Sequence, residues 1–282
     1  MAKKPTMALL YDFDKTLSTK DMQEYSFIPK IGMKPADFWA ESNRLAKEQK
    51  MDKMLAYMYV MLDRARSAKF RIHRQAFVEL GKDAEFYKGV EEWFEAINQY
   101  ANELNIELEH YIISSGLREI LEGTSIFKYF KEVFACEYYY DENEVACWPK
   151  NLVNYTTKTQ FLTRINKGVL DISEDDALNQ FTPEEQRPIP FRNMIYIGDG
   201  YTDIPCMKLV KEYGGYSIAV YPKTKKETAR RLLNEGRVDF IVPADYSKEG
   251  KLFPLVCSML RKMEATDGLK QLHSKQIAEG NL

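Results

Sequence analysis

Short apolar runs that end abruptly in small or polar residues are the clearest pattern along the chain. Such runs are typical of parallel strands buried on both faces. The pattern predicts strands at residues 7–11, 110–113, 194–197, 216–221 and 238–242. Apolar positions at helical spacing lie between them and predict helices at residues 90–104, 117–121, 157–167, 202–214 and 224–236. Strands that alternate with helices indicate an α/β fold, a Rossmann-like open parallel sheet covered on both faces.

Two helix starts carry capping residues, and one stretch suggests an added hairpin. Thr157 and Gln160 have the spacing of a capping box, and Thr202 is placed to cap the helix after the third strand. Residues 135–156 predict an extra hairpin.

The segment from residue 18 to residue 88 departs from this alternation. It contains helical patterns at 35–49, 52–66 and 72–80 and no convincing strand. So long a stretch is not an ordinary connection between sheet elements. It predicts an inserted helical domain, with residues 1–17 and 89–265 forming the α/β core and residues 266–282 a polar, partly flexible tail.

Composition narrows the possible partners. The 282 residues carry 40 Lys and Arg against 42 Asp and Glu, a net charge of −2 that gives no reason to expect nucleic acid or an anionic membrane as partner. The longest apolar run, residues 54–62, is well short of the ~20 residues of a membrane span. The N-terminal apolar stretch is too short for a signal peptide. The 4 cysteines form no Cys-x-x-Cys pair, which favours free thiols and a cytoplasmic protein.

Two acids follow the first strand directly. The segment from Asp12 to Thr16 reads Asp-Phe-Asp-Lys-Thr. In extended backbone residues i and i+2 face the same way, so Asp12 and Asp14 project together. Because adjacent carboxylates repel, they suit either a metal site or an acid beside an ionised nucleophile. An ordinary solvated acidic turn is the alternative.

A second acidic motif follows the strand at 194–197. Gly198 to Asp203 reads Gly-Asp-Gly-Tyr-Thr-Asp. The glycines permit a tight turn, and Asp199 can bind a hard cation through oxygen. It is not a dinucleotide-binding motif, because Asp203 stands where the third glycine belongs. A glycine turn with an acid at a helix start is the alternative.

Two weaker signals suit an anion. Ser114, Ser115 and Gly116 end the second strand before a short helix, where a hydroxyl and backbone N–H groups form an anion cradle, although a serine cap is equally ordinary. Lys158 lies in the first helical turn, against the helix dipole, so a nearby anion would explain it. A solvated surface lysine is the alternative for that residue.

These positions converge on one edge of the sheet. Ligands of open α/β sheets bind at the carboxyl ends of the strands, and Asp12, Asp14, Ser114 and Asp199 all follow such ends. A site with carboxylates, a hydroxyl, a lysine and a metal ion suits phosphoryl transfer.

With these motifs in this order, the chain resembles phosphatases of the haloacid dehalogenase-like superfamily, in particular the phosphoserine phosphatase-like branch. The insert lies where that branch carries a cap domain. Ser115 and Thr202 depart from the branch, which usually has Gly and Asn there. Asp14 argues against dehalogenation, since dehalogenases of the superfamily lack the second aspartate.

The resemblance implies a set of roles. Asp12 would be the nucleophile and Asp14 the general acid and base. Mg²⁺ would be held by the Asp12 carboxylate, the Asp14 backbone carbonyl and Asp199, while Asp203 orients a metal-bound water or Lys158. Lys158 and Ser114, with backbone N–H groups near Ser115 and Gly116, would hold the phosphate, and Thr16 and Thr202 would support the site.

The expected activity is hydrolysis of a small phosphorylated metabolite, with residues 18–88 acting as a lid that excludes large substrates. Two other classes remain open at this point. One is a receiver-like signalling module with a phosphorylated aspartate, and the other is a binding protein that kept the fold without turnover.

Overall fold

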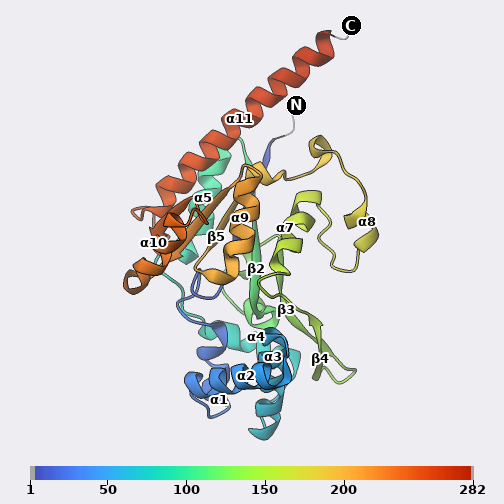
Figure 1. The fold of residues 1–282 in the computed structure, drawn as a ribbon, viewed down its shortest axis with the longest axis vertical. Helices are drawn as coiled ribbons and strands as arrows, with labels where there is room; N and C mark the ends of the chain where they lie inside the picture. Colours follow the sequence, from blue (N-terminus) through green and yellow to red (C-terminus); the bar gives the residue numbers. More distant parts are fainter. Residues whose placement is uncertain (1–3, 281–282) are drawn as a thin grey trace.

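A seven-stranded sheet forms the centre of the molecule in the computed structural model, which describes residues 4–280 (Figure 1). Its order is β4-β3-β2-β1-β5-β6-β7, and all neighbouring strands are parallel except β3 and β4. The strands are β1 (Thr6–Tyr11), β2 (Glu107–Leu117), β3 (Glu132–Tyr140), β4 (Ala146–Asn151), β5 (Met194–Gly198), β6 (Tyr216–Tyr221) and β7 (Phe240–Pro243). The predicted α/β class and open parallel sheet are confirmed.

The register of the central strands aligns their carboxyl ends. Tyr11 at the end of β1 pairs with Ile197 in β5 on one side and with Ile112 in β2 on the other. The backbone N–H of Asp12 continues the ladder by donating to the Ile197 carbonyl at 3.0 Å. Residues that follow β1, β2 and β5 therefore meet at one edge of the sheet.

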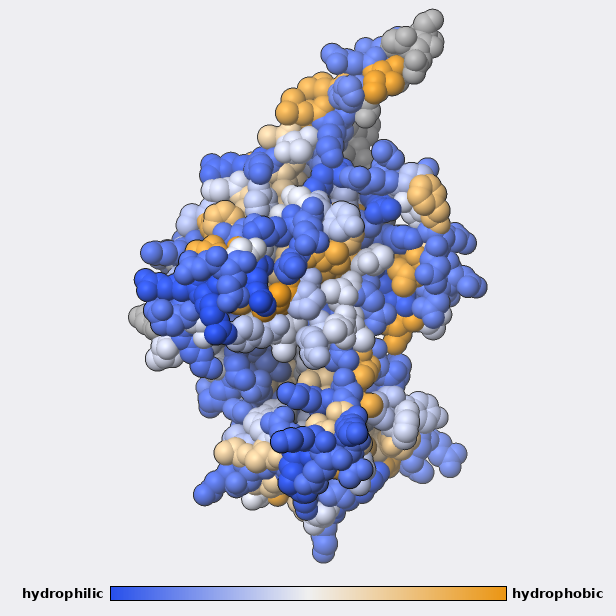
Figure 2. Space-filling view, viewed as in Figure 1, coloured by the Kyte–Doolittle hydropathy of each residue, from blue (hydrophilic) through white to orange (hydrophobic). Residues whose placement is uncertain are grey.

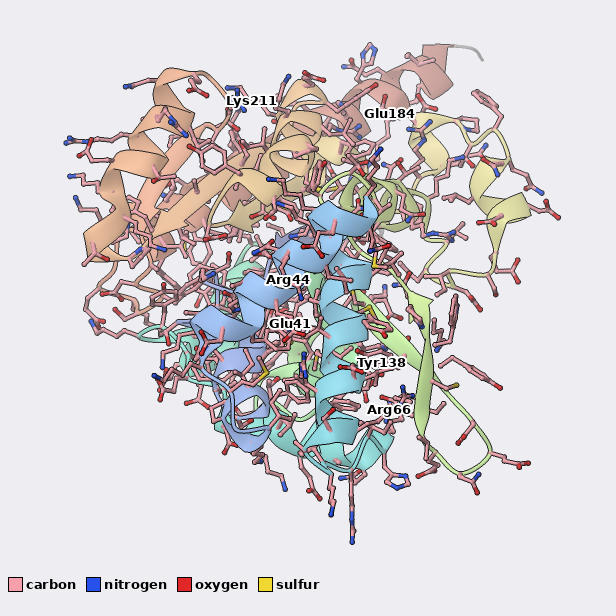
Figure 3. The ribbon with its side chains drawn as sticks, turned by 60° about the horizontal axis from the view of Figure 1, so that its bottom comes forward. Glu41, Arg44, Arg66, Tyr138, Glu184 and Lys211 are labelled. Carbon is pink, nitrogen blue, oxygen red and sulfur yellow. The ribbon has the colours of Figure 1, made fainter. Side chains whose placement is uncertain are left out.

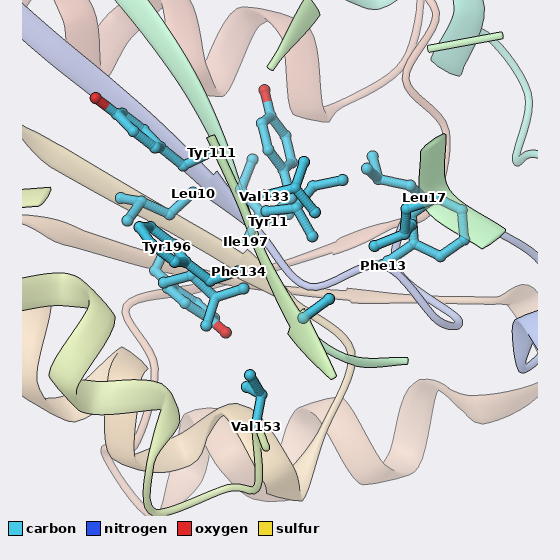
Figure 4. Packing of buried hydrophobic residues seen from close by; sticks show 14 of the residues in the cluster. Leu10, Tyr11, Phe13, Leu17, Tyr111, Val133, Phe134, Val153, Tyr196 and Ile197 are labelled. Carbon is cyan, nitrogen blue, oxygen red and sulfur yellow. The ribbon is translucent and has the colours of Figure 1, made fainter. Parts of the chain in front are cut away.

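Helices cover both faces of the sheet, as the sequence predicts. α5 (Val90–Glu103) and α11 (Leu252–Gly280) lie on one face, and α7 (Lys158–Lys167) and α9 (Ile204–Glu212) on the other (Figure 1). α10 (Lys226–Asn234) packs on β6 and β7. Figure 4 shows the core between these layers, where Leu10, Tyr11 and Tyr196 are buried among other apolar side chains.

The remaining helical segments are short. They are α6 (Arg118–Glu122), α8 (Asp175–Asn179) and the 3₁₀ turns η1 (Met22–Glu24), η2 (Gly81–Asp83), η3 (Phe127–Tyr129), η4 (Glu184–Gln186), η5 (Phe191–Asn193), η6 (Tyr201–Asp203) and η7 (Lys223–Lys225). Within residues 4–280, the structure contains no helix that combines the length and apolarity required to cross a membrane.

Residues 18–88 are helical, and they lie at the carboxyl edge of the sheet in Figure 1. The helices are α1 (Phe27–Lys30), α2 (Pro35–Gln49), α3 (Lys53–Ser67) and α4 (Arg74–Leu80). Pro35 starts α2 at a position where its missing N–H costs nothing, and the Asp52 side chain caps α3 by accepting from the Met54 N–H at 2.8 Å. Figure 3 shows α2 and α3 side by side, and Glu41 of α2 pairs with Arg64 of α3. The short helix α1 was not predicted.

The predicted hairpin at residues 135–156 is present, and one of its strands has a second role. β3 pairs antiparallel with β4 but also lies parallel to β2 in the main sheet. The sequence analysis did not predict this position in the sheet, although the half of β3 that pairs with β2 is mostly apolar.

Both predicted caps are wrong. Thr157 stands at the cap position of α7, but its hydroxyl does not bond an N–H of the helix. Instead, Asn154 Oδ1 accepts the N–H groups of Thr156 and Thr157, so this asparagine supplies the turn before the helix. Thr202 lies inside η6, and α9 begins only at Ile204.

The C-terminal segment differs from its predicted form. Residues 266–280, for which the sequence predicts a partly flexible tail, are the last part of α11, and residues 281–282 lie outside the described part. This end of the helix projects beyond the body of the molecule, and its apolar residues stand out in Figure 2.

Paired glycines join the helical insert to the rest of the molecule. α4 packs on α6 where Gly81 and Gly123 bring the two backbones together. A methyl group on Gly123 would overlap the Val78 carbonyl oxygen, and one on Gly81 would overlap the Ile120 carbonyl oxygen. The contact therefore depends on the absence of side chains at both positions.

Gly123→Ala should destabilise the protein by about 1–3 kcal/mol, because the new methyl group forces two backbones apart. Its backbone conformation is right-handed helical, so no dihedral strain contributes. Gly268→Ala in α11 is the matched control, since its methyl group would meet open space, and it should stabilise by about 0.5–1 kcal/mol. Urea unfolding of both variants measures the difference, and equal stabilities would show that the α4–α6 contact is loose.

Candidate active site

A buried lysine bridges two aspartates at the carboxyl edge of the sheet. Lys158 Nζ lies 2.8 Å from Asp12 Oδ1 and 2.8 Å from Asp203 Oδ1, and the ammonium group is almost fully buried. The Tyr196 hydroxyl donates to the same Asp203 oxygen at 2.8 Å. Two carboxylates thus explain why a lysine occupies the first turn of α7, against the helix dipole.

A cluster of acids surrounds this bridge. Carboxylate oxygens of Asp12, Asp199 and Asp203 lie within 4.8 Å of one another. Asp203 Oδ2 is buried and has no hydrogen-bond partner among the described residues. A Cβ at Gly198 would come within 2.5 Å of that oxygen, so only glycine leaves it room. Converging oxygen ligands of this kind suit a hard divalent cation.

Burial and mutual repulsion disfavour ionisation of Asp12 and Asp199. Burial, followed by repulsion from Asp203, raises the pKa of Asp12 to about 6, although Lys158 opposes the shift. Burial, with Asp12 and Asp203 nearby, raises the pKa of Asp199 to about 8. Burial alone would lower the pKa of Lys158, but its two aspartates raise it overall. The lysine therefore stays charged, and the cluster gains from an added cation.

Asp14 lies in a different environment from Asp12. Its Oδ1 accepts the Met22 N–H at 2.7 Å, and a Cβ at Gly116 would lie 3.1 Å from its Oδ2. Burial raises the pKa of Asp14 well above its ordinary value, with repulsion from Asp21 and Asp12 adding to the effect. The environments of the two aspartates thus differ: Lys158 favours the ionised form of Asp12, whereas burial favours the neutral form of Asp14.

The two serines of the predicted anion cradle lie in different environments. Ser115 lines the cavity above the acids, whereas Ser114 is completely buried and its hydroxyl accepts the Gly116 N–H at 3.0 Å. The next N–H, that of Leu117, points to Met22 Sδ at 3.1 Å. Two of the backbone N–H groups beyond Ser115 are therefore already engaged.

The two supporting threonines lie in different places. Thr16 is buried, and its carbonyl accepts the Tyr246 hydroxyl at 2.9 Å, so it fixes the loop after Asp14. Thr202 is exposed on η6 and lines the cavity.

A cavity of about 700 Å³ opens above these residues. Its floor is formed by Asp12, Asp14, Ser115, Lys158 and Asp199. The helical insert forms much of its wall, with Asp21, Gln23, Trp39, Ser42, Asn43, Lys53, Met54 and Tyr57. The sequence analysis missed these wall residues and Tyr196, which reads as an ordinary core residue within an apolar strand.

The comparison with protein families decides the classification. The family model of the haloacid dehalogenase-like hydrolase matches residues 9–208, which include all the motifs of the site. The chain belongs to the haloacid dehalogenase-like hydrolase family. The resemblance found in the sequence is therefore confirmed, and the chain is a member of a family of hydrolases.

Solved structures of haloacid dehalogenase-like proteins share this fold. A substrate-bound phosphoserine phosphatase is 16% identical, with a TM-score of 0.51, over 84% of this chain and 100% of that chain. A probable phosphoserine phosphatase from Vibrio cholerae is 12% identical, with a TM-score of 0.56, over 93% of this chain and 67% of that chain. These likenesses confirm the fold of the phosphoserine phosphatase-like branch.

A curated relative covers nearly the whole chain. An uncharacterized protein of Borreliella burgdorferi is 28% identical over an alignment 274 residues long, which covers 88% of this chain and 94% of the relative. The similarity extends over both the sheet and the helical insert.

The raised pKa values of Asp12 and Asp199 predict how the metal-free protein responds to pH. Both folded values, about 6 and about 8, exceed the ordinary value of 3.8. Between about pH 4 and 8 these two carboxyl groups therefore bind more protons in the folded protein than in the unfolded chain, and their contribution to stability falls as pH rises. Asp199→Asn should reduce this fall, because the amide does not ionise.

Urea unfolding in EDTA at pH 5 and pH 8 measures the effect. Asp176→Asn, an exposed aspartate on α8, is the control and should leave the pH dependence unchanged. An Asp199→Asn variant with the pH dependence of the unaltered protein would contradict a raised pKa at Asp199.

Proposed function

We propose that this protein is a Mg²⁺-dependent phosphomonoester hydrolase that acts on a small phosphorylated metabolite through an aspartyl-phosphate intermediate. The observation that carries the proposal is the bridge of Lys158 between Asp12 and Asp203 beside the acidic cluster. The arrangement supplies a nucleophile, fixed positive charge for phosphoryl oxygens and ligands for a cation at one point of the sheet edge.

Asp12 is the proposed nucleophile. Lys158 favours the ionised carboxylate, and the hydrogen bond from the Asp12 N–H to Ile197 holds its backbone at the end of β1. Attack on phosphorus forms an acyl phosphate on Asp12 and breaks the bond to the leaving alkoxide. Lys158 also offers positive charge to the phosphoryl oxygens, and Ser115 is placed on the same side of the cavity.

Asp14 is the proposed general acid. Its raised pKa favours the protonated carboxyl group, whose proton can be given to the leaving oxygen. Once ionised, the same group can take a proton from the water that attacks the acyl phosphate. The hydrogen bond from Met22 holds the carboxyl group in place for both steps.

Asp12 and Asp199, with the backbone carbonyl of Asp14, would hold Mg²⁺. When bound, the ion neutralises charge on the phosphoryl group and on the acidic cluster. Asp203 already contacts both Lys158 and Tyr196, which supports a role in positioning Lys158. Its unpartnered Oδ2 leaves one oxygen for the ion or for a water bound to it.

Residues 18–88 are proposed to be a cap domain over this site. Their helices supply much of the cavity wall, which supports a chamber for a small metabolite rather than a surface for a macromolecule. The four cysteines are free, three of them buried, which supports a reducing compartment such as the cytoplasm.

Asp12→Asn should abolish turnover, because the amide is a poor nucleophile and loses the charge that Lys158 and Mg²⁺ require. The loss should exceed about 10³-fold. Hydrolysis of a panel of phosphorylated metabolites with Mg²⁺, and with a chelator, measures it. Asp37→Asn, an exposed aspartate of α2, is the matched control. A folded Asp12→Asn protein with near-normal activity would exclude the mechanism.

Asp14→Asn should slow hydrolysis in a way that depends on the leaving group. An alkyl phosphate needs a proton at its leaving oxygen, whereas an activated aryl phosphate needs much less help. The variant should therefore lose about 10²–10⁴-fold more activity on the alkyl than on the aryl substrate if the acid makes its usual contribution. Steady-state rates on both substrates test this, and equal losses would argue against Asp14 as the general acid.

A further inference from the structure

The helical insert contributes aromatic side chains to the wall of the cavity. Trp39 of α2 and Tyr57 of α3 contact each other edge to face, with ring centroids 6.2 Å apart, and Met54 lies on the same wall. The Trp39 indole N–H donates to Glu24 at 2.8 Å, so its polar edge is already satisfied. Trp39 is partly exposed, whereas Tyr57 is only 3% exposed, so the apolar surface that this wall offers to a ligand ring is mainly that of Trp39.

The wall is tied to the part of the core that faces the phosphate. The Tyr57 hydroxyl donates to the Ser115 backbone carbonyl at 2.9 Å. Because Ser115 lies on the cavity floor, the aromatic side chains adjoin the part of the cavity proposed to hold the phosphate. A group attached to the phosphate through a short link would therefore meet the wall directly.

A buried amide lies beside this wall without a partner. Gln23 lines the cavity, is only 2% exposed, and makes no hydrogen bond to any described residue through its side chain. Its Oε1 is fully buried. The neighbouring residue, Met22, donates its N–H to Asp14, so Gln23 lies next to the proposed general acid.

An unsatisfied buried amide carries a cost that a ligand can relieve. Native proteins leave few buried polar atoms unpaired, and such exceptions call for an explanation. In a cavity that takes a substrate, the explanation is a ligand that donates a hydrogen bond. We assign the donor to the leaving group, because the residue before Gln23 contacts Asp14, the proposed general acid, through its backbone N–H.

We propose that the site selects phosphomonoesters of ring-bearing alcohols, with the ring on Trp39 and Tyr57 and a hydroxyl or N–H of the ring paired with Gln23. This inference rests on the proposed phosphatase function and specifies its substrate class. Short open-chain phosphates would cover neither the aromatic wall nor the amide.

Three kinds of substrate separate the contributions. Ethyl phosphate has neither a ring nor a donor, benzyl phosphate has the ring alone, and 3- and 4-hydroxybenzyl phosphates add one hydroxyl. With Mg²⁺ present, kcat/KM should rise by about tenfold with the ring and by about tenfold again with the hydroxyl in at least one isomer, since a site built around a hydrogen bond discriminates strongly against its absence.

Variants assign each step to its residue. Trp39→Leu should remove most of the preference for benzyl over ethyl phosphate, and Gln23→Met most of the preference for hydroxybenzyl over benzyl phosphate. Two matched controls lie outside the cavity wall: Trp148→Leu on β4, where the indole is 71% exposed, and Gln99→Met on α5. Both controls should keep the two preferences.

The outcomes distinguish this inference from the proposed function. If no substrate is hydrolysed in a Mg²⁺-dependent way, both fail together. If ethyl phosphate is turned over as efficiently as the aromatic substrates, the phosphatase function stands and the ring selectivity is overturned. If the ring preference survives Trp39→Leu, or the hydroxyl preference survives Gln23→Met, the assigned wall is wrong.

Discussion

The buried ammonium group of Lys158 is the constraint on which the site depends. A charge removed from water is tolerated only when it is paired and hydrogen-bonded, and here two aspartates from different segments supply the pairing. Asp12 follows β1, Asp203 ends η6, and Lys158 opens α7. With Asp199 also ionised, the three acids and one ammonium leave two uncompensated negative charges. That deficit equals the charge of one divalent cation, the kind of ion that converging carboxylate oxygens suit.

The floor of the site could be predicted because it follows from parallel topology. In a parallel sheet the residues after each strand share an edge, so Asp12 and Asp199 were expected together and are found together. Lys158 was predicted at this site because a cation in the first turn of a helix opposes the helix dipole and calls for a nearby anion. In the structure, Asp12 and Asp203 are those anions. Ser114 was harder to place, since strand alternation decides which of two adjacent serines faces the cavity, and Ser115 is the one that does.

The wall of the site could not be predicted, for a different physical reason. The spacing that places Trp39 and Tyr57 on their helices says nothing about how those helices pack on the sheet. That packing is set by two contacts. Gly81 and Gly123 allow two backbones to approach closely, and the Tyr138 hydroxyl of the β3–β4 hairpin donates to the Met58 carbonyl at 2.7 Å (Figure 3). The local sequence also gave wrong caps at Thr157 and Thr202. The Asn154 side chain supplies the turn before α7, and Thr202 lies within the 3₁₀ turn η6.

The contacts that anchor the helical insert bear on how ligands reach and leave the cavity. On the hairpin side, the Tyr138 hydrogen bond, the Arg74–Glu122 ion pair and the glycine contact would all have to break for the insert to lift. Among the described residues, no hydrogen bond or ion pair joins positions 18–83 to positions 199–235, which face them across the cavity. Lys53 on one side and Lys225 on the other line the cavity and are exposed, so two ammonium groups can attract a phosphate dianion toward the acids.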